Sequence, residues 1–184
     1  MGLADWSPKD WDFLAAYYVP GIIAVKAGSE YDTFDKLYEA IKAGTVSCGT
    51  AGLGSTGYTN LCILASLDEA FNPASGAYKH IAYSGGAAAI TAVISGEVDF
   101  TPQLSNEMID YLRSGDMVAL AALTEEDLVL DGVDYAIPSL KNFIPEAESV
   151  LPCGDAFGLL FPSDVPEEAK TVLEASYLKA CESD

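Results

Sequence analysis

Two glycine-rich loops contain the residues whose types and spacing could bind a small anion. The first loop runs from Gly52 to Gly57 (Gly-Leu-Gly-Ser-Thr-Gly), and the second from Tyr83 to Ala87 (Tyr-Ser-Gly-Gly-Ala). Each lies between an expected strand and an expected helix. A helix N-terminus presents unpaired N–H groups and the positive end of the helix dipole, so it attracts a carboxylate or phosphate. Two such loops in successive strand–helix units favour a shared anion site.

The first loop also matches the spacing G-x-G-x-x-G of dinucleotide-binding proteins. That pattern requires an acidic residue at the end of the next strand to bind a ribose hydroxyl. The next expected strand ends at Ala82-Tyr83-Ser84 and has no acidic residue there. Glycines that only permit tight turns are a second explanation. A nucleotide- or phosphate-binding α/β enzyme domain that uses the loop from Gly52 to Gly57 is the alternative function.

Residues that could carry catalysis or bind a metal are scarce. His80 is the one histidine, and the four cysteines include no C-x-x-C pair, so zinc-binding spacing is absent. We expect no enzyme activity, no metal and no cofactor. Buried free thiols are expected at Cys48 and Cys62, although four cysteines allow three disulfide pairings and the sequence does not choose among them.

The composition excludes several classes of partner. The chain has 184 residues, with 28 acidic and 9 basic ones, and a formal net charge of −19. Such a field repels nucleic acid and anionic lipid surfaces. Half of the residues are hydrophobic, so the charge does not indicate disorder. The one arginine, Arg113, rules out an arginine cluster, and a bound anion would depend on neutral donors: backbone N–H groups and the hydroxyls of Ser55, Thr56 and Ser84.

The elements that position the two loops follow from hydrophobic spacing and from helix-end signals. Thr33 is a plausible N-cap of a helix that ends before Gly44. Short strands that alternate with helices of about ten residues predict an α/β fold with a mostly parallel sheet flanked by helices. Residues 1–17 and 124–152 are expected to be irregular. The expected strands are 45–50, 78–83, 97–101, 117–123 and 155–161. The expected helices are 34–43, 57–68, one that follows the loop at Gly86 and ends before Gly96, 104–113 and one from 166 onward.

The loops and their surroundings resemble the substrate-binding receptors of tripartite tricarboxylate transporters, also called Bug-type receptors. The resemblance covers roughly residues 5–180 in order and spacing. The segments that carry it are Tyr31 to Phe34, Ser47 to Gly57, Tyr83 to Thr91, Gly96 to Phe100, Leu112 to Leu120 and Phe157 to Pro162.

The resemblance implies an extracytoplasmic (periplasmic or lipid-anchored) receptor with a periplasmic-binding-protein-like fold. Such a receptor closes two lobes on a small organic carboxylate and delivers it to the membrane permease subunits of the transporter. No signal segment is visible in this sequence, and the family is usually longer, so we expect a truncated chain. Residues 18–125 would form the second ligand-binding lobe. Residues 1–17 and 126–184 would form the hinge and a remnant of the first lobe, whose exposed aromatic residues could favour a dimer.

The family's ligand-binding loops can be placed on this sequence residue by residue. The implied ligand-binding residues are Gly54, Ser55, Thr56, Ser84, Gly85, Gly86, Ala87 and, as a further wall, Gln103. Tyr58 stands where the family often has histidine, and Ser84 where it usually has lysine. Gln103 stands where an acidic residue is frequent. With two fewer cationic partners, the ligand is expected to differ in charge or size from that of other members.

Overall fold

The computed structural model describes residues 7–182. It divides into two compact units: Val19–Asp155, and a smaller unit formed by residues up to Tyr18 together with those from Ala156 onward. The first six residues of the predicted first-lobe remnant, and the last two residues of the chain, lie outside the described part.

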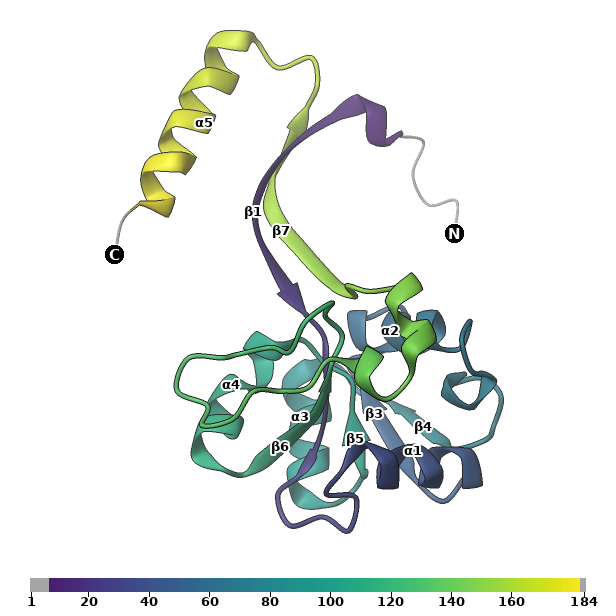
Figure 1. Cartoon of the computed structure of the whole chain (residues 1–184). Helices are drawn as coiled ribbons and strands as arrows, with labels where there is room; N and C mark the ends of the chain where they lie inside the picture. Colours follow the sequence, from purple (N-terminus) through teal and green to yellow (C-terminus); the bar gives the residue numbers. More distant parts are fainter. Residues whose placement is uncertain (1–6, 183–184) are drawn as a thin grey trace. The chain divides into compact units, whose positions relative to one another are not determined.

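A five-stranded sheet forms the centre of the larger unit (Figure 1). Its strands lie in the order β4-β3-β5-β2-β6. Strand β3 is parallel to β4 and β5, whereas β2 is antiparallel to both β5 and β6, so four strands share one direction and β2 alone opposes them. The predicted fold class, a mostly parallel sheet flanked by helices, is confirmed. The strand bounds are β2 Ile22–Lys26, β3 Ser47–Thr50, β4 Lys79–Ala82, β5 Phe100–Thr101 and β6 Met117–Ala122.

Local signals set the ends of the helices in this unit. Thr33 caps α1 by accepting a hydrogen bond from the backbone N–H of Lys36, and Gly44 ends the helix with a φ of 69°, as the sequence predicted. Helix α2 ends earlier than expected, because the chain turns at Ala65 and Asp68 then caps a short 3-10 turn. The bounds are α1 Phe34–Ala43, α2 Thr56–Leu64, α3 Gly86–Ser95 and α4 Ser105–Ser114, with 3-10 turns η2 Glu69–Phe71, η3 Leu140–Asn142 and η4 Pro145–Ser149.

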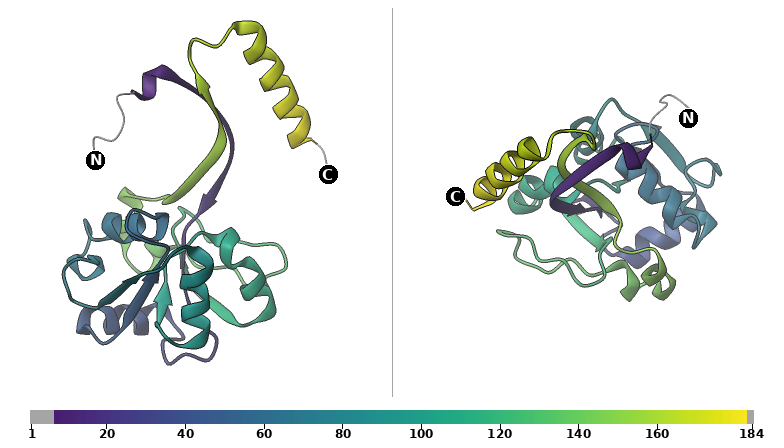
Figure 2. Two further views of the ribbon diagram at one scale, coloured as in Figure 1. Left: turned by 180° about the vertical axis from the view of Figure 1, so that it is seen from behind. Right: turned by 90° about the horizontal axis from the view of Figure 1, so that it is seen from above.

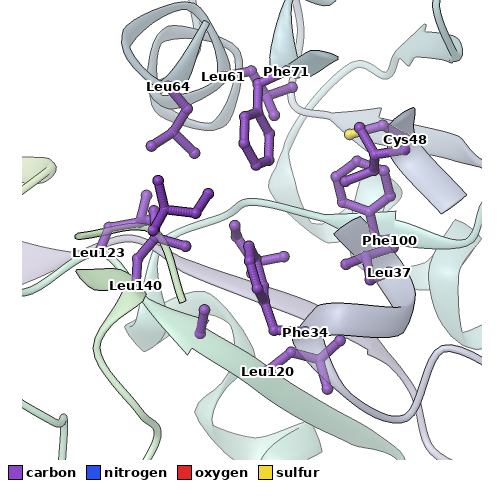
Figure 3. Packing of buried hydrophobic residues seen from close by; sticks show 14 of the residues in the cluster. Phe34, Leu37, Cys48, Leu61, Leu64, Phe71, Phe100, Leu120, Leu123 and Leu140 are labelled. Atoms are coloured by element: carbon purple, nitrogen blue, oxygen red, sulfur yellow. The ribbon is translucent and has the colours of Figure 1, made fainter. Parts of the chain in front are cut away.

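Helices lie on both faces of the sheet (Figure 2), and each face packs against its own hydrophobic core. Helices α1 and α2 cover one face, where their buried side chains meet those of η2 and η3 (Figure 3). Helices α3 and α4 cover the other face through side chains that include Ile90 and Met108. Successive residues of β2 alternate between the two cores: Ile23 belongs to the first and Ala24 to the second. Strand β2 is therefore buried on both sides.

The segment after β6 belongs to the larger unit as well. Leu140, Ala147 and Cys153 are buried in the core that α1 and α2 cover, and Ile137 in the other core. The compact unit thus extends to Asp155, beyond the predicted boundary at residue 125. The assignment of the two units to receptor lobes stays a prediction.

The smaller unit consists of a 3-10 turn, a two-stranded ribbon and a helix. Its elements are η1 Pro8–Asp10, β1 Trp11–Pro20, β7 Gly154–Pro162 and α5 Glu167–Cys181; the ends of β1 and β7 extend into the larger unit. The expectation of irregular chain up to residue 17 is wrong, because residues from Trp11 onward pair with β7. At Gly158 a Cβ would lie 2.2 Å from the carbonyl oxygen of Leu14, so the ribbon requires glycine there. Helix α5 has no buried side chain.

Candidate functional site

The two glycine-rich loops meet at one edge of the sheet. Strands β3 and β4 are parallel, so both end at this edge, and each leads through a loop into α2 or α3. The backbone N–H of Tyr83 donates to the carbonyl of Thr50 at 2.8 Å. A Cβ on Gly52 would lie 3.4 Å from the carbonyl oxygen of Tyr83, so the loops are in contact. The N-termini of α2 and α3 therefore open side by side, where ligands of open α/β sheets bind.

In the first loop, two hydroxyls are already hydrogen-bonded. Ser55 caps α2, and its Oγ accepts from the N–H of Tyr58 at 3.4 Å. Thr56 Oγ1 donates to Oδ2 of Asp155 at 2.5 Å, which places a carboxylate beside the first turn of α2. Gly54 adopts a φ of 84°, which strongly favours glycine, and no atom would contact a Cβ there within 4 Å. The space next to Gly54 is therefore not filled by other parts of the protein.

In the second loop, the start of α3 lacks a side-chain cap. Gly85 is the N-cap residue in an extended conformation, and a Cβ on it would meet no heavy atom within 4 Å. Ser84 and Ala87 are exposed. Gly86 faces a carboxylate: an added Cβ would lie 2.5 Å from Oε1 and 2.6 Å from Oε2 of Glu107. Burial, and then the charge of Asp155, raise the pKa of the Glu107 carboxyl above its ordinary value.

Two buried amide side chains lie next to the first turn of α2. Gln103 is 2% exposed; its Oε1 would be 3.2 Å from a Cβ on Gly57, and its Nε2 has no partner among the described residues. Asn60, also 2% exposed, likewise has an Nδ2 without a partner in that part of the chain. Buried amide nitrogens are normally hydrogen-bonded, so these two donors mark positions where an acceptor is missing.

A pocket of about 230 Å³ opens beside the start of α2. Its wall combines hydroxyl, amide and carboxylate groups with apolar side chains, a composition that suits a small polar ligand. The residues that line it are Gly54, Thr56, Thr59, Asn60, Ile63, Val150, Pro152, Cys153, Gly154 and Asp155.

The histidine and the cysteines do not form a reactive group. His80 lies on β4, with its Nε2 2.8 Å from Oγ1 of Thr50, and burial lowers its pKa so that the neutral ring is favoured. The four cysteines are free thiols. Cys48 is buried as predicted, but the same prediction for Cys62 is wrong, because Cys62 points away from the core that Leu61 and Leu64 enter. Within residues 7–182 no cluster of potential metal ligands occurs, and no helix there is long and apolar enough to cross a membrane.

The structure thus brings the predicted site residues together at one edge. Gly54, Ser55 and Thr56 begin α2, Ser84 to Ala87 begin α3, and the amide of Gln103 lies against α2; their role in binding stays a prediction. Sequence reasoning missed Asn60, Glu107 and Asp155. The available signal for Asn60 was its position four residues after Thr56, which puts the two residues on the same face of α2. Asp155 had none, because it is 99 residues from Thr56 in the chain.

Comparisons with known proteins agree with this geometry. The model of the tripartite tricarboxylate transporter family receptor matches residues 13–182. None of the curated proteins matches the chain. Among solved structures, a TctC solute-binding protein from Polaromonas is 22% identical with a TM-score of 0.74, covering 100% of this chain and 59% of that one.

Two further similar structures are from Rhodopseudomonas palustris. One, described with bound malate, is 17% identical with a TM-score of 0.73. The match covers 98% of this chain and 58% of that one. The other, described with adipate, is 19% identical with a TM-score of 0.72, and the shares covered are 97% of this chain and 57% of that one. At these identities the likeness shows the fold, and this chain spans little more than half the length of each.

The family match covers nearly the whole chain and agrees with the resemblance noted in the sequence. Its members are solute-binding receptors, in agreement with the prediction of a binding protein and not an enzyme. The chain belongs to the tripartite tricarboxylate transporter receptor family.

Proposed function

We propose that this chain provides a ligand-binding lobe of a solute receptor, and that the lobe holds a small carboxylate at the starts of α2 and α3. The observation that carries the proposal is the juxtaposition of these two helix N-termini at one sheet edge, in a chain of this receptor family. Both helices begin at this edge, and the unpaired backbone N–H groups of their first turns would donate to the same anion. The structures described with malate and adipate support a carboxylate as the ligand class.

The proposed contacts come from both loops. Backbone N–H groups of Gly54 and Thr56 and at Gly85 to Ala87 would donate to the carboxylate, with the Ser84 hydroxyl at the side; the N–H of Ser55 already donates to the carbonyl of Gly52. Gln103 would form a wall next to α2, where its amide side chain is buried against Gly57. Neutral donors of this kind bind an anion without a cationic side chain, which reconciles the site with a net charge of −19.

The biological setting follows from the family. We propose that the receptor works outside the cytoplasm and delivers its ligand to the permease subunits of a tripartite tricarboxylate-type transporter. Because the chain spans 57–59% of the similar receptors described above, we expect it to supply part of the cleft and to bind more weakly than a complete receptor. Exposed aromatic residues of the ribbon, such as Phe13 and Tyr17, would favour the dimer that the sequence suggested.

Gly85 allows a direct test. A Cβ at Gly85 would have no protein atom within 4 Å, so we expect Gly85→Val to fill the ligand's space and leave the fold intact. Loss of one or two N–H contacts to an anion corresponds to roughly a 10- to 100-fold weaker affinity. NMR titration of the whole chain with succinate, malate, butyrate, aspartate and 4-aminobutyrate would measure this. Gly85→Ala, a smaller obstruction, should give an intermediate loss. An unchanged affinity in Gly85→Val, or no binding of any acid by the wild type, would refute the proposal.

A further inference from the structure

We infer that His80 makes anion binding at this sheet edge dependent on pH, because its protonated ring strengthens the binding of a carboxylate at the loop from Gly52 to Gly57. The inference rests on the proposed function, since it concerns the same site. It gives a role to the one histidine of the chain, which the proposed contacts leave unused.

The first observation is the position of the His80 ring beside the start of α2. The ring lies against that of Tyr58, with 5.3 Å between the ring centroids, and Tyr58 is the third residue of the helix. The backbone N–H of Tyr58 donates to the hydroxyl of Ser55, which caps α2. The imidazole is therefore one side chain away from the helix turn at which the carboxylate is proposed to bind.

The second observation is that a buried hydroxyl fixes the ring. Nε2 of His80 lies 2.8 Å from Oγ1 of Thr50, a residue with no exposed surface. Thr50 ends β3, and its carbonyl accepts from the N–H of Tyr83 at the start of the second loop. A hydroxyl can donate or accept, so it can pair with the neutral ring and with the protonated ring. Protonation therefore adds a positive charge at a fixed place next to the loops.

The third observation concerns the charges around the ring. The titratable side chains on the elements packed against it are Tyr58 and Cys62 on α2, Cys48 on β3, and Tyr78 and Lys79, which precede it in the chain. These groups include no carboxylate. Burial lowers the pKa of His80, so the ring is mostly neutral at pH 7 and gains its charge as the pH falls. A bound ligand carboxylate would then be the opposite charge that the ring lacks.

A single charge matters here because the segment that contains both loops has few cations. Between Lys42 and Arg113 the sequence has one lysine, Lys79, and one histidine. Lys79 is exposed on the edge strand β4. One positive charge near a partly exposed carboxylate should strengthen binding about three- to tenfold. The effect opposes the repulsion that the net charge of −19 exerts on an anion.

His80 also has a purely structural explanation, as a half-buried side chain that gives the Thr50 hydroxyl a partner. In that role protonation costs stability in acid, because the pKa of His80 is lower in the folded chain than in the unfolded one, and a ligand does not affect the ring. Linkage separates the two explanations. If protonation strengthens ligand binding, the bound ligand must raise the pKa of His80 by the same free energy.

The test compares the affinity of the whole chain for malate and for butyrate at about pH 5 and about pH 8, measured by NMR titration. Acid also protonates part of each ligand, but this affects all variants equally, so each affinity is divided by that of His80→Gln. The ratio of wild type to His80→Gln should be about three- to tenfold higher at the lower pH. Lys79→Gln removes an exposed charge next to His80 and should keep the pH dependence of the wild type.

The His80 ring gives a second readout, because its NMR signals are the only histidine signals of the chain. Saturating malate should raise the pKa of His80 in the wild type, and this measurement decides alone if His80→Gln does not fold. An unchanged or lowered pKa, or equal pH dependence in wild type and His80→Gln, would overturn the inference and leave carboxylate binding standing. Absence of binding of both acids at both pH values would overturn the proposed function as well.

Discussion

Gly57 provides the sharpest test of how the fold holds the site together. It lies in the first turn of α2, where a Cβ would be 2.8 Å from the carbonyl oxygen of Pro102 and 3.2 Å from Oε1 of Gln103. The nearer atom belongs to the backbone, so it cannot move aside as a flexible side chain would. Gly57→Ala should therefore push the start of α2 away from the loop that holds Gln103.

The expected magnitude is the difference between two effects. Overpacking a tight site costs about 1–3 kcal/mol, and replacing glycine by alanine in a helix gains about 0.5–1 kcal/mol. The gain should be at the lower end because Gly57 is near the helix terminus. The net loss is about 0.5–2.5 kcal/mol, which lowers the melting temperature by roughly 1–10 °C for a chain of this size.

Urea unfolding followed by circular dichroism would measure the loss, provided that the slope of the transition stays unchanged. Gly85→Ala is the matched control, because no atom lies within 4 Å of its Cβ, and its stability should stay within about 0.5 kcal/mol of the wild type. If Gly57→Ala is as stable as the wild type, or more stable, then α2 does not pack against Pro102 as described and the reasoning fails.

Two further predictions concern other parts of the larger unit. The hydroxyl of Tyr38 donates to Asp68 and lowers the pKa of that carboxyl, so this bond stabilises the fold above the ordinary pKa of about 3.9 and is lost as the pH falls through the lowered value. Tyr38→Phe should thus destabilise the protein at pH 6 and converge on the wild type in acid; a constant difference in urea midpoint from pH 6 to pH 2 would contradict this. Cys62 and Cys181 are exposed, whereas burial raises the pKa of the Cys48 thiol well above its usual range, so a thiol reagent should modify Cys62 and Cys181 quickly and Cys48 only on unfolding. Mass spectrometry that found Cys48 labelled as fast as Cys62 in the native chain would show the core to be open.

The parts of the fold that the sequence predicted depend on local signals. Helix α1 was predicted because Thr33 and Gly44 act on their own neighbours. Strand β2 was not predicted. Ile22 and Ala24 enter one core and Ile23 enters the other, so the strand is buried on both faces and lacks the alternation of apolar and polar residues that marks a half-buried strand. The pairing of β1 with β7 joins distant parts of the chain and likewise had no local pattern.

The same limit applies to the site. The loops from Gly52 to Gly57 and from Tyr83 to Ala87 were recognisable because glycines and hydroxyls precede amphipathic helices. The acidic residues Glu107 and Asp155 could not be recognised, because only tertiary contacts bring them next to these loops. Glu107 looks like an ordinary first-turn residue of α4 until α3 is placed against it.

Strand β2 also has a consequence for how the protein folds. It lies inside the larger unit's sheet, next to the edge strand β6, and the β6 residues that it pairs with are about a hundred positions further along the chain. Closing so long a loop costs entropy before the sheet core returns any stability. Strands β3 and β4, separated by one helix, can pair early, but the sheet is incomplete until β2 enters between β5 and β6. We therefore expect slow folding, in the range of proteins with high contact order, and late protection of the β2 amides from hydrogen exchange during refolding.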